Sequence, residues 1–363
     1  MKNEYLQILD QFNLGGQVKE VTPFGNGHIN DTFKTVAPDG ESRYILQRIN
    51  HSIFTRVDIL QSNIRTVTSH IRKKLEEKGE SDIDRKVLTF LPARDGKNFY
   101  CDGKNYWRVC LMIPRSQSFE KITPELACQA GKAFGKFQYM LSDIPKGVLQ
   151  ETIPDFHNME FRLQQLKGAV VANTAGRLSQ VQTLVNEIES RAEGMCIQER
   201  LYREGSLKKR INHCDTKVNN ILFDEDGQAL CVIDLDTVMP GFVLSDFGDF
   251  VRTGANTGLE DDEDLSRVGV DMDIFKAYAK GYLEYARSFL TPLEIRLLPY
   301  GARLLTYMQT VRFLTDYLNG DTYYKINRPD HNLIRTKAQF KLLLSLEAAK
   351  EKMKAYIKSV IQG

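Results

Sequence analysis

Three polar residues between positions 211 and 236 have the types and spacing that phosphoryl transfer requires. Asp215 follows His213 by two positions and precedes Asn220 by five, an H-x-D-x-x-x-x-N arrangement. In this arrangement the aspartate accepts the proton of the acceptor hydroxyl and the asparagine binds magnesium. We therefore expect Asp215 to be the general base and Asn220 to be a metal ligand. His213 would hold the loop through hydrogen bonds.

The residues after Asn220 predict a β-hairpin that returns a second oxygen ligand to the same place. A short apolar strand at 221–223 is followed by an Asp-Glu-Asp-Gly turn. The second apolar strand, at 230–233, ends at Asp234. This hairpin would place Asp234 beside Asn220, where two side-chain oxygens can converge on one hard cation such as Mg²⁺.

A second acidic motif lies nearby, because residues 246–248 spell Asp-Phe-Gly, the metal-binding tripeptide of protein kinases. It lies a further turn along the chain, beyond residues 239–241, where a helix is predicted to begin. We interpret Asp246 as a helix-start or buried structural carboxylate and assign the metal to Asp234.

These motifs resemble those of the aminoglycoside phosphotransferase and choline kinase-like small-molecule kinases, which share a two-lobed fold with protein kinases. The resemblance rests on the H-x-D-x-x-x-x-N motif followed by I-D-x-D at 233–236. It implies that Asp215 is the base and that Asn220 and Asp234 bind magnesium. It also implies that Asp236 supports the metal site or binds a second ion.

Two segments are similar to bacterial N-acetylhexosamine 1-kinases in particular. They are HCDTKVNNILFD at 213–224 and RFLTDYLNGDTYYK at 312–325. This resemblance implies an ATP-dependent kinase that acts on a sugar hydroxyl.

A glycine-containing stretch near the N-terminus is typical of the phosphate-covering loop of kinases. Strands are predicted at 18–24 and 32–36. The residues of the loop between them are Gly25, Asn26, Gly27 and His28. Because glycines let backbone amides approach phosphates closely, we expect this loop to cover the phosphates of ATP. A plain hairpin turn has the same composition, whereas a dinucleotide-binding motif would need a third glycine and a following helix.

The third predicted strand, at 44–49, lacks the lysine that binds the α- and β-phosphates in kinases. Neighbouring strand residues face opposite ways, so either Arg48 or Gln47 could face the nucleotide; we assign Arg48. The helix predicted at 57–78 has no glutamate before Glu76, so the usual lysine and glutamate pair is missing as well.

Further strands, predicted at 86–91, 98–101 and 106–113, complete a small sheet. The resemblance places at Met112 and Ile113 the hinge whose backbone would contact adenine.

From Thr123 onward the pattern is helical, with long helices predicted at 266–286, 292–319 and 333–361. This pattern of strands followed by helices predicts an α+β fold, and the resemblance implies a protein kinase-like fold with two lobes. Residues 1–113 would form a small β-rich N-terminal lobe, and residues 114–363 would form a large helical C-terminal lobe.

An acceptor site is predicted near the end of the 292–319 helix. Arg312 lies on its polar face, and Tyr323 and Tyr324 follow Gly320. Aromatic rings with hydroxyl groups suit sugars, because they combine stacking with hydrogen bonding. On the residues alone an exposed ion pair with Asp316, four positions after Arg312, is equally plausible. The resemblance favours the sugar site.

His157, which precedes a predicted helix, is a further candidate to contact a sugar hydroxyl. Capping or packing is the more common role of a histidine at such a position, and both interpretations stay open here.

The composition excludes several classes of protein. The 363 residues carry a formal charge of +2, with 42% hydrophobic and 26% charged residues, so a polyanion-binding surface is not indicated. No apolar run approaches the roughly 18 residues that span a bilayer. Six scattered cysteines without a C-x-x-C pair favour a reducing cytoplasm. We expect a cytoplasmic monomer or weak dimer that binds neither nucleic acid nor membrane.

The sequence therefore predicts a kinase that uses ATP and Mg²⁺ to phosphorylate a small-molecule hydroxyl, and the resemblance implies the anomeric hydroxyl of an N-acetylhexosamine. Other acceptors that fit are an aminoglycoside, choline or homoserine. Two alternatives come from other classes: a nucleotide-binding pseudokinase, and a metal-assisted hydrolase built on Asp234, Asp236 and Asp246.

Overall fold

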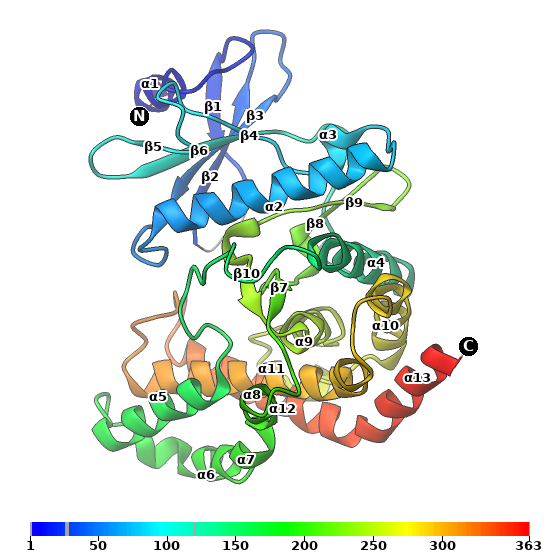
Figure 1. Ribbon diagram of the computed structural model, residues 1–363. Coiled ribbons are helices and arrows are strands. Elements are labelled where there is room, and N and C mark those ends of the chain that lie inside the picture. The colour runs from blue at the N-terminus through cyan, green and yellow to red at the C-terminus, as the bar shows by residue number, and fades with distance from the viewer. Residues whose placement is uncertain (1, 26–28, 120, 363) are drawn as a thin grey trace. The chain divides into compact units, whose positions relative to one another are not determined.

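The computed structural model describes residues 2–25, 29–119 and 121–362 of the chain (Figure 1). The chain forms two compact units, each assembled from three separate segments. The first unit combines residues 1–118, 140–154 and 220–239, and the second combines 119–139, 155–219 and 240–363. The predicted boundary at residue 113 would instead place two segments of the first unit, 140–154 and 220–239, in the helical C-terminal lobe.

The first unit is built on an antiparallel sheet with strand order β1-β2-β3-β6-β4, in which β5 also pairs with β6. Its first nine elements are α1 (Lys2–Leu9), β1 (Glu20–Pro23), β2 (Asp31–Val36), β3 (Tyr44–Ile49), α2 (Val57–Glu77), α3 (Ile83–Lys86), β4 (Phe90–Leu91), β5 (Tyr100–Cys101) and β6 (Tyr106–Leu111). The strand predicted from residue 86 is therefore shorter than expected, because its first residue ends the short helix α3.

Side chains alternate between the two faces of the sheet along β3 and β6, so an apolar pair on one face is followed by a polar pair on the other. Leu46 and Val109 are direct partners across the two strands and are fully buried in a cluster that includes Leu9 of α1. The next pair along the ladder, Gln47 and Arg108, faces the other side of the sheet. Arg108 is nevertheless 2% exposed, so its charge must be neutralised within the protein.

The predicted hairpin is confirmed in the first unit. Strands β8 (Ile221–Phe223) and β9 (Ala229–Val232) pair antiparallel, with Ile221 opposite Val232. In the turn between them, the Asp224 carboxylate accepts hydrogen bonds from the backbone N–H groups of Asp226 and Gln228. The 3₁₀ turns η1 (Val218–Asn220) and η2 (Leu235–Thr237) flank the hairpin.

The second unit is mainly helical and is organised around α11 (Pro292–Leu318), which packs against α9, α12 and α5 (Figure 1). The remaining elements are α4 (Pro124–Leu141), α5 (Met159–Ala172), α6 (Leu178–Glu189), α7 (Ala192–Met195), α8 (Ile197–Arg203), β7 (Arg210–Asn212), β10 (Met239–Gly241), α9 (Val243–Gly254), η3 (Leu265–Arg267), α10 (Met272–Ala286), α12 (His331–Ala348) and α13 (Lys350–Gln362). A capping box between Thr291 and Glu294 fixes the start of α11.

Two of the helix predictions need correction at their ends. The segment predicted as one helix at 333–361 is two, because α12 ends at Ala348 and α13 begins at Lys350. The segment predicted at 266–286 begins as the 3₁₀ turn η3 and becomes α-helical only from Met272. None of the described helices is long and apolar enough to cross a lipid bilayer.

Helices α9 and α11 approach each other closely through glycines. A Cβ atom added to Gly248 would lie 2.2 Å from the carbonyl oxygen of Gly301, and one added to Gly301 would lie 2.4 Å from the carbonyl oxygen of Leu244. A side chain at either position would force the helices apart. The glycine of the Asp-Phe-Gly tripeptide is therefore required for helix packing in this protein, and Phe247 beside it is fully buried.

Candidate active site

Asp246 holds the backbone of the loop that carries Asp215. Its two carboxylate oxygens accept hydrogen bonds from the N–H groups of His213 and Cys214, both at 2.8 Å. The amide of Gln138 donates a third bond at 2.7 Å. Burial raises the pKa of Asp246 to about 6, although His213 and these hydrogen bonds act in the opposite direction. With its oxygens occupied in this way, Asp246 has the structural role that its sequence position suggested.

His213 lies inside the second unit, where its ring meets the edges of Phe134 and Phe137 at centroid distances of 5.6 and 5.8 Å. Its Nδ1 atom accepts a hydrogen bond from the backbone N–H of Asp215 at 3.3 Å. The side chain is fully buried. This position suits a residue that holds the loop.

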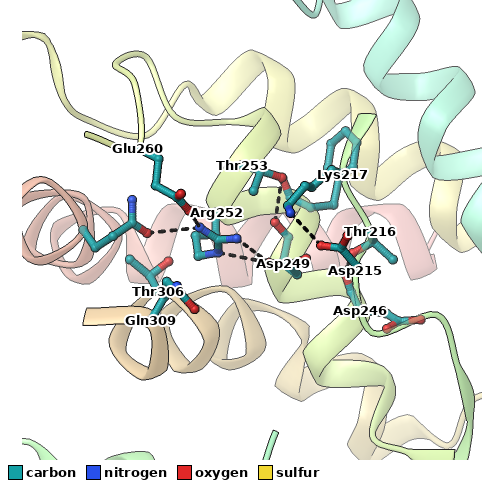
Figure 2. Close-up of polar contacts among 12 residues, drawn as sticks. Asp215, Thr216, Lys217, Asp246, Asp249, Arg252, Thr253, Glu260, Thr306 and Gln309 are labelled. Atoms are coloured by element: carbon teal, nitrogen blue, oxygen red, sulfur yellow. Dashed lines mark hydrogen bonds and ion pairs between the residues drawn. The ribbon is translucent and has the colours of Figure 1, made fainter. Parts of the chain in front are cut away.

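Lys217 is a functional candidate that the sequence analysis missed. Its ammonium group lies 2.9 Å from a carboxylate oxygen of Asp215, as Figure 2 shows. Asp215 raises the pKa of Lys217, and the carboxylates of Asp249 and Glu260 contribute in the same direction. The sequence contained a sign of this role, because Lys217 follows Asp215 by two positions and the third strand has no lysine to bind phosphate.

Next to this pair, Arg252 of α9 connects two further carboxylates (Figure 2). Its guanidinium donates to Asp249 at 2.8 Å and to Glu260 at 2.5 Å. Arg252 and Asp249 are both buried. The network ties the segment that contains Glu260 to the helix beside the Asp215 loop.

In the first unit, the hairpin brings Asn220 and Asp234 next to each other, as predicted. The carbonyl oxygen of Asn220 accepts a hydrogen bond from the N–H of Ile233 at 2.9 Å. Asp234 follows immediately and has a left-handed backbone, with φ of 59°. Amide and carboxylate oxygens are the ligand types that Mg²⁺ prefers.

Asp236, predicted to support the metal site or bind a second ion, has protein partners at both of its carboxylate oxygens. Arg108 forms a buried ion pair with both of its oxygens, one at 2.9 Å, and the amide of Asn30 donates to it as well. Both partners are almost fully buried, at 2% and 3% exposed. With its charge already compensated by Arg108, Asp236 is better suited to support the metal site than to bind the ion itself, and Asn220 and Asp234 stay the first candidates for metal ligands.

The contact of Arg48 with the nucleotide phosphates stays a prediction. Arg48 is exposed and pairs with Asp31 of the neighbouring strand. Gln47, on the opposite face of β3, accepts a hydrogen bond from Arg108 at 2.9 Å. The buried cation of this sheet therefore comes from β6, and it acts electrostatically on Asp234 as well as on Asp236.

The other residues predicted to contact the nucleotide are only partly described. Gly25 is exposed, with φ of 75°, a conformation that favours glycine. Asn26, Gly27 and His28 lie outside the described residues. Met112 and Ile113 directly follow β6; the Met112 N–H donates to the carbonyl of Arg43, and the Ile113 carbonyl accepts from Ser116.

Arg312 is the centre of an aromatic cluster in the second unit. Its guanidinium lies over the rings of Phe156, Tyr324 and Tyr323, at 5.2, 5.5 and 5.9 Å from their centroids. It also donates to Gln309, whose amide donates in turn to the hydroxyl of Tyr324. The structure therefore brings together the three residues predicted for the acceptor and adds Phe156 to them.

Asp316 does not pair with Arg312, so the alternative of a surface ion pair is wrong. It is 4% exposed and accepts hydrogen bonds from the N–H groups of Tyr323 at 2.8 Å and Tyr324 at 2.9 Å. The amide of Asn332 donates to it at 2.8 Å. Asp316 therefore positions the two tyrosines, which the i, i+4 spacing alone did not indicate.

His157 lies at the edge of this cluster, with its ring stacked on Phe156 at a centroid distance of 4.5 Å. Its Nδ1 atom is buried and has no hydrogen-bond partner. Burial, followed by the charges of Arg312 and Arg162, lowers the pKa of His157 to about 3, while Asp215 acts in the opposite direction. The imidazole is therefore neutral at pH 7 and lies within the electrostatic influence of Asp215.

We expect Asp316→Asn to weaken acceptor binding. An amide cannot accept all the hydrogen bonds that the carboxylate receives, and each unsatisfied buried donor costs about 1–3 kcal/mol. The KM for the acceptor should rise while the KM for ATP changes little. Steady-state kinetics with each substrate varied in turn measure this. Asp273→Asn, an exposed carboxylate on α10, is the control and should leave both constants unchanged. Equal kinetics for the two variants would contradict the role of Asp316.

The family and the fold agree with this site. The model of the phosphotransferase enzyme family matches residues 98–287, more than half of the chain, and includes the whole stretch from 211 to 236. Three solved structures are similar over nearly their full lengths. An aminoglycoside phosphotransferase from Alicyclobacillus acidocaldarius subsp. acidocaldarius has 12% identity and a TM-score of 0.59, over 98% of this chain and 95% of that one.

Spectinomycin phosphotransferase, solved with ADP and spectinomycin, has 13% identity and a TM-score of 0.60, over 97% of this chain and 99% of that one. A choline/ethanolamine kinase family protein from Mesorhizobium loti has 14% identity and a TM-score of 0.59, over 99% of both chains. These likenesses confirm the predicted protein kinase-like fold, with a small antiparallel sheet and a mostly helical remainder. The chain therefore belongs to the phosphotransferase enzyme family.

Proposed function

We propose that the enzyme transfers the γ-phosphoryl group of ATP to the anomeric hydroxyl of an N-acetylhexosamine. The observation that supports this proposal is the aromatic cluster around Arg312, which consists of Phe156, Tyr323 and Tyr324. Next to the cluster lies His157, a neutral imidazole whose pKa the charge of Asp215 influences. Aromatic faces, hydroxyl groups and a charged donor are the features that recognise a sugar with an N-acetyl oxygen.

In the proposed reaction, Asp215 orients the acceptor hydroxyl and accepts its proton. The hydroxyl oxygen forms the new bond to the γ-phosphorus. The bond from this phosphorus to the bridging oxygen breaks, and its electron pair leaves with ADP. Positioning and charge neutralisation account for most of the rate in such a reaction.

Two groups of this chain would hold the charges of the nucleotide. Asn220 and Asp234 fit a magnesium ion, because both are oxygen ligands at the base of one hairpin. When bound, magnesium neutralises charge on the phosphate oxygens. Lys217, held 2.9 Å from Asp215, would supply a second positive charge near the transferred group.

The same cluster argues against cationic acceptors such as aminoglycosides and choline. An ammonium group binds well over an exposed aromatic face. Here the Arg312 guanidinium already lies over the rings of Phe156, Tyr323 and Tyr324. A second cation would be repelled by it, so a neutral or negatively charged acceptor fits better. Membership of a phosphotransferase family sets aside the pseudokinase and hydrolase alternatives.

Arg312→Ala tests the proposal. A sugar oxygen that loses a charged donor should cost about 1.5–3 kcal/mol, or about ten- to a hundred-fold in kcat/KM for the acceptor. ATP affinity should stay nearly unchanged. The measurement is steady-state kinetics with N-acetylglucosamine, N-acetylgalactosamine and ATP varied in turn.

Arg303→Ala is the matched control, because Arg303 lies nine residues earlier on the same helix with its guanidinium 5.9 Å from the ring centre of Tyr300. Its acceptor kinetics should match those of the parent. Unaltered acceptor kinetics in Arg312→Ala, or no turnover of these two sugars or of their substituted derivatives by the parent enzyme, would remove the N-acetylhexosamine assignment.

A further inference from the structure

Two arginines meet at Phe156 without a carboxylate to neutralise them. Arg162, in the first turn of α5, donates to the carbonyl oxygen of Phe156 at 2.9 and 3.3 Å and to Gln165 at 2.8 Å. Arg312 covers the ring of the same phenylalanine and donates to Gln309. Neither arginine forms an ion pair with any of the residues that the structure describes.

Two other arginines of this unit are paired with buried carboxylates. Arg210 lies 2.8 Å from Glu294, and Arg252 lies 2.8 Å from Asp249. Burying a charge is costly unless an opposite charge compensates it. Burial, followed by the charge of Arg312, lowers the pKa of Arg162 to about 10. The two arginines therefore repel each other in the absence of a ligand.

A buried nitrogen atom next to these two arginines also lacks a hydrogen-bond partner. The Nδ1 atom of His157, the residue after Phe156, is buried without a hydrogen bond. A neutral imidazole can donate to an oxygen through one ring nitrogen. The two guanidinium groups and this imidazole all contact Phe156, and the charge of Asp215 acts on His157.

We propose that the acceptor carries a negatively charged oxygen group, a carboxylate, phosphate or sulfate, which Arg162 and Arg312 receive while Asp215 holds the reacting hydroxyl. The planar guanidinium fork matches such oxyanions with two parallel hydrogen bonds. This inference rests on the proposed function: the sugar is an N-acetylhexosamine or a close relative, and the charged group is an additional substituent on it.

The test compares neutral and charged sugars as acceptors. The panel contains N-acetylglucosamine and N-acetylgalactosamine, their phosphate and sulfate esters at C3, C4 or C6, and sugars that carry a carboxylate at C3 or C6. The parent enzyme should use at least one charged sugar with a kcat/KM about ten- to a hundred-fold above that of its neutral counterpart. The phosphate, sulfate and carboxylate arms distinguish the source of the charge.

Arg162→Gln should reduce this preference for the charged sugar by about ten- to a hundred-fold. Arg162→Lys keeps the charge but loses the fork, and should retain part of the preference. Arg203→Gln is the control, because Arg203 is an exposed arginine paired with Glu160. Its ratio of kcat/KM for the charged sugar to kcat/KM for the neutral sugar should equal that of the parent. The rise in melting temperature with Mg²⁺ and ATP shows that each variant is folded.

Two results would overturn the inference in distinguishable ways. If the neutral sugars are phosphorylated as efficiently as every charged one, the anion site is wrong and the proposed function stands. If no sugar in the panel is phosphorylated although Mg²⁺ and ATP stabilise the protein, the proposed function fails and this inference fails with it.

Discussion

Replacing Asp215 with asparagine should lower kcat by about 10²-fold or more, the usual contribution of a general base. The variant keeps the shape of the side chain but removes its ability to accept the hydroxyl proton. The hydrogen bond from its backbone to His213 and those from the neighbouring N–H groups to Asp246 do not involve the carboxylate of Asp215, so the loop should keep its structure. Steady-state turnover measures the loss.

Nucleotide binding provides the control for this variant. The shift in melting temperature with Mg²⁺ and ATP should stay close to that of the parent, because Asn220 and Asp234 are unchanged. Near-normal turnover in a folded Asp215→Asn variant would show that Asp215 is not the base.

Two aspartates should give different defects when each is changed to alanine. Asp234→Ala should abolish magnesium-dependent activity in a protein that still folds, because the change removes one of two proposed metal ligands at the hairpin. Asp246→Ala should chiefly reduce stability. It leaves the buried N–H groups of His213 and Cys214 without an acceptor, at a cost of about 1–3 kcal/mol each.

Activity as a function of magnesium concentration and thermal unfolding of both variants separate these effects. Each variant is the control for the other, since both lose one carboxylate. A stable but inactive Asp246→Ala protein together with an active Asp234→Ala protein would transfer the metal role to Asp246.

The sequence by itself determined the local part of the site. The hairpin after Asn220 was predictable because turn residues and two short apolar runs fix strand pairing within a dozen residues, and the observed strands agree with it. The small set of strands before residue 113 and the long helical patterns after residue 123 predicted an α+β fold, and the resemblance of the motifs at 213–236 implied that it is kinase-like. The five-residue spacing between Asp215 and Asn220 was likewise visible in the sequence.

Only the tertiary structure decided which charged residues are neutralised. The positions of Asp234, Asp236 and Asp246 in the sequence suggest different roles for them but do not identify the side chains that contact them. Asp236 is paired with Arg108, which lies 128 residues away in the chain. The side-chain partner of a carboxylate depends on which strands and helices pack together, and residue spacing contains no information on that.

The same reason explains the acceptor site. Spacing on α11 suggested an ion pair between Arg312 and Asp316, yet Asp316 binds the backbone of the tyrosine segment and Arg312 turns to Phe156. Arg162 reaches the same phenylalanine from α5. The two arginines come from helices that are far apart in sequence, so the charge left without a partner at this site became visible only when the helices packed.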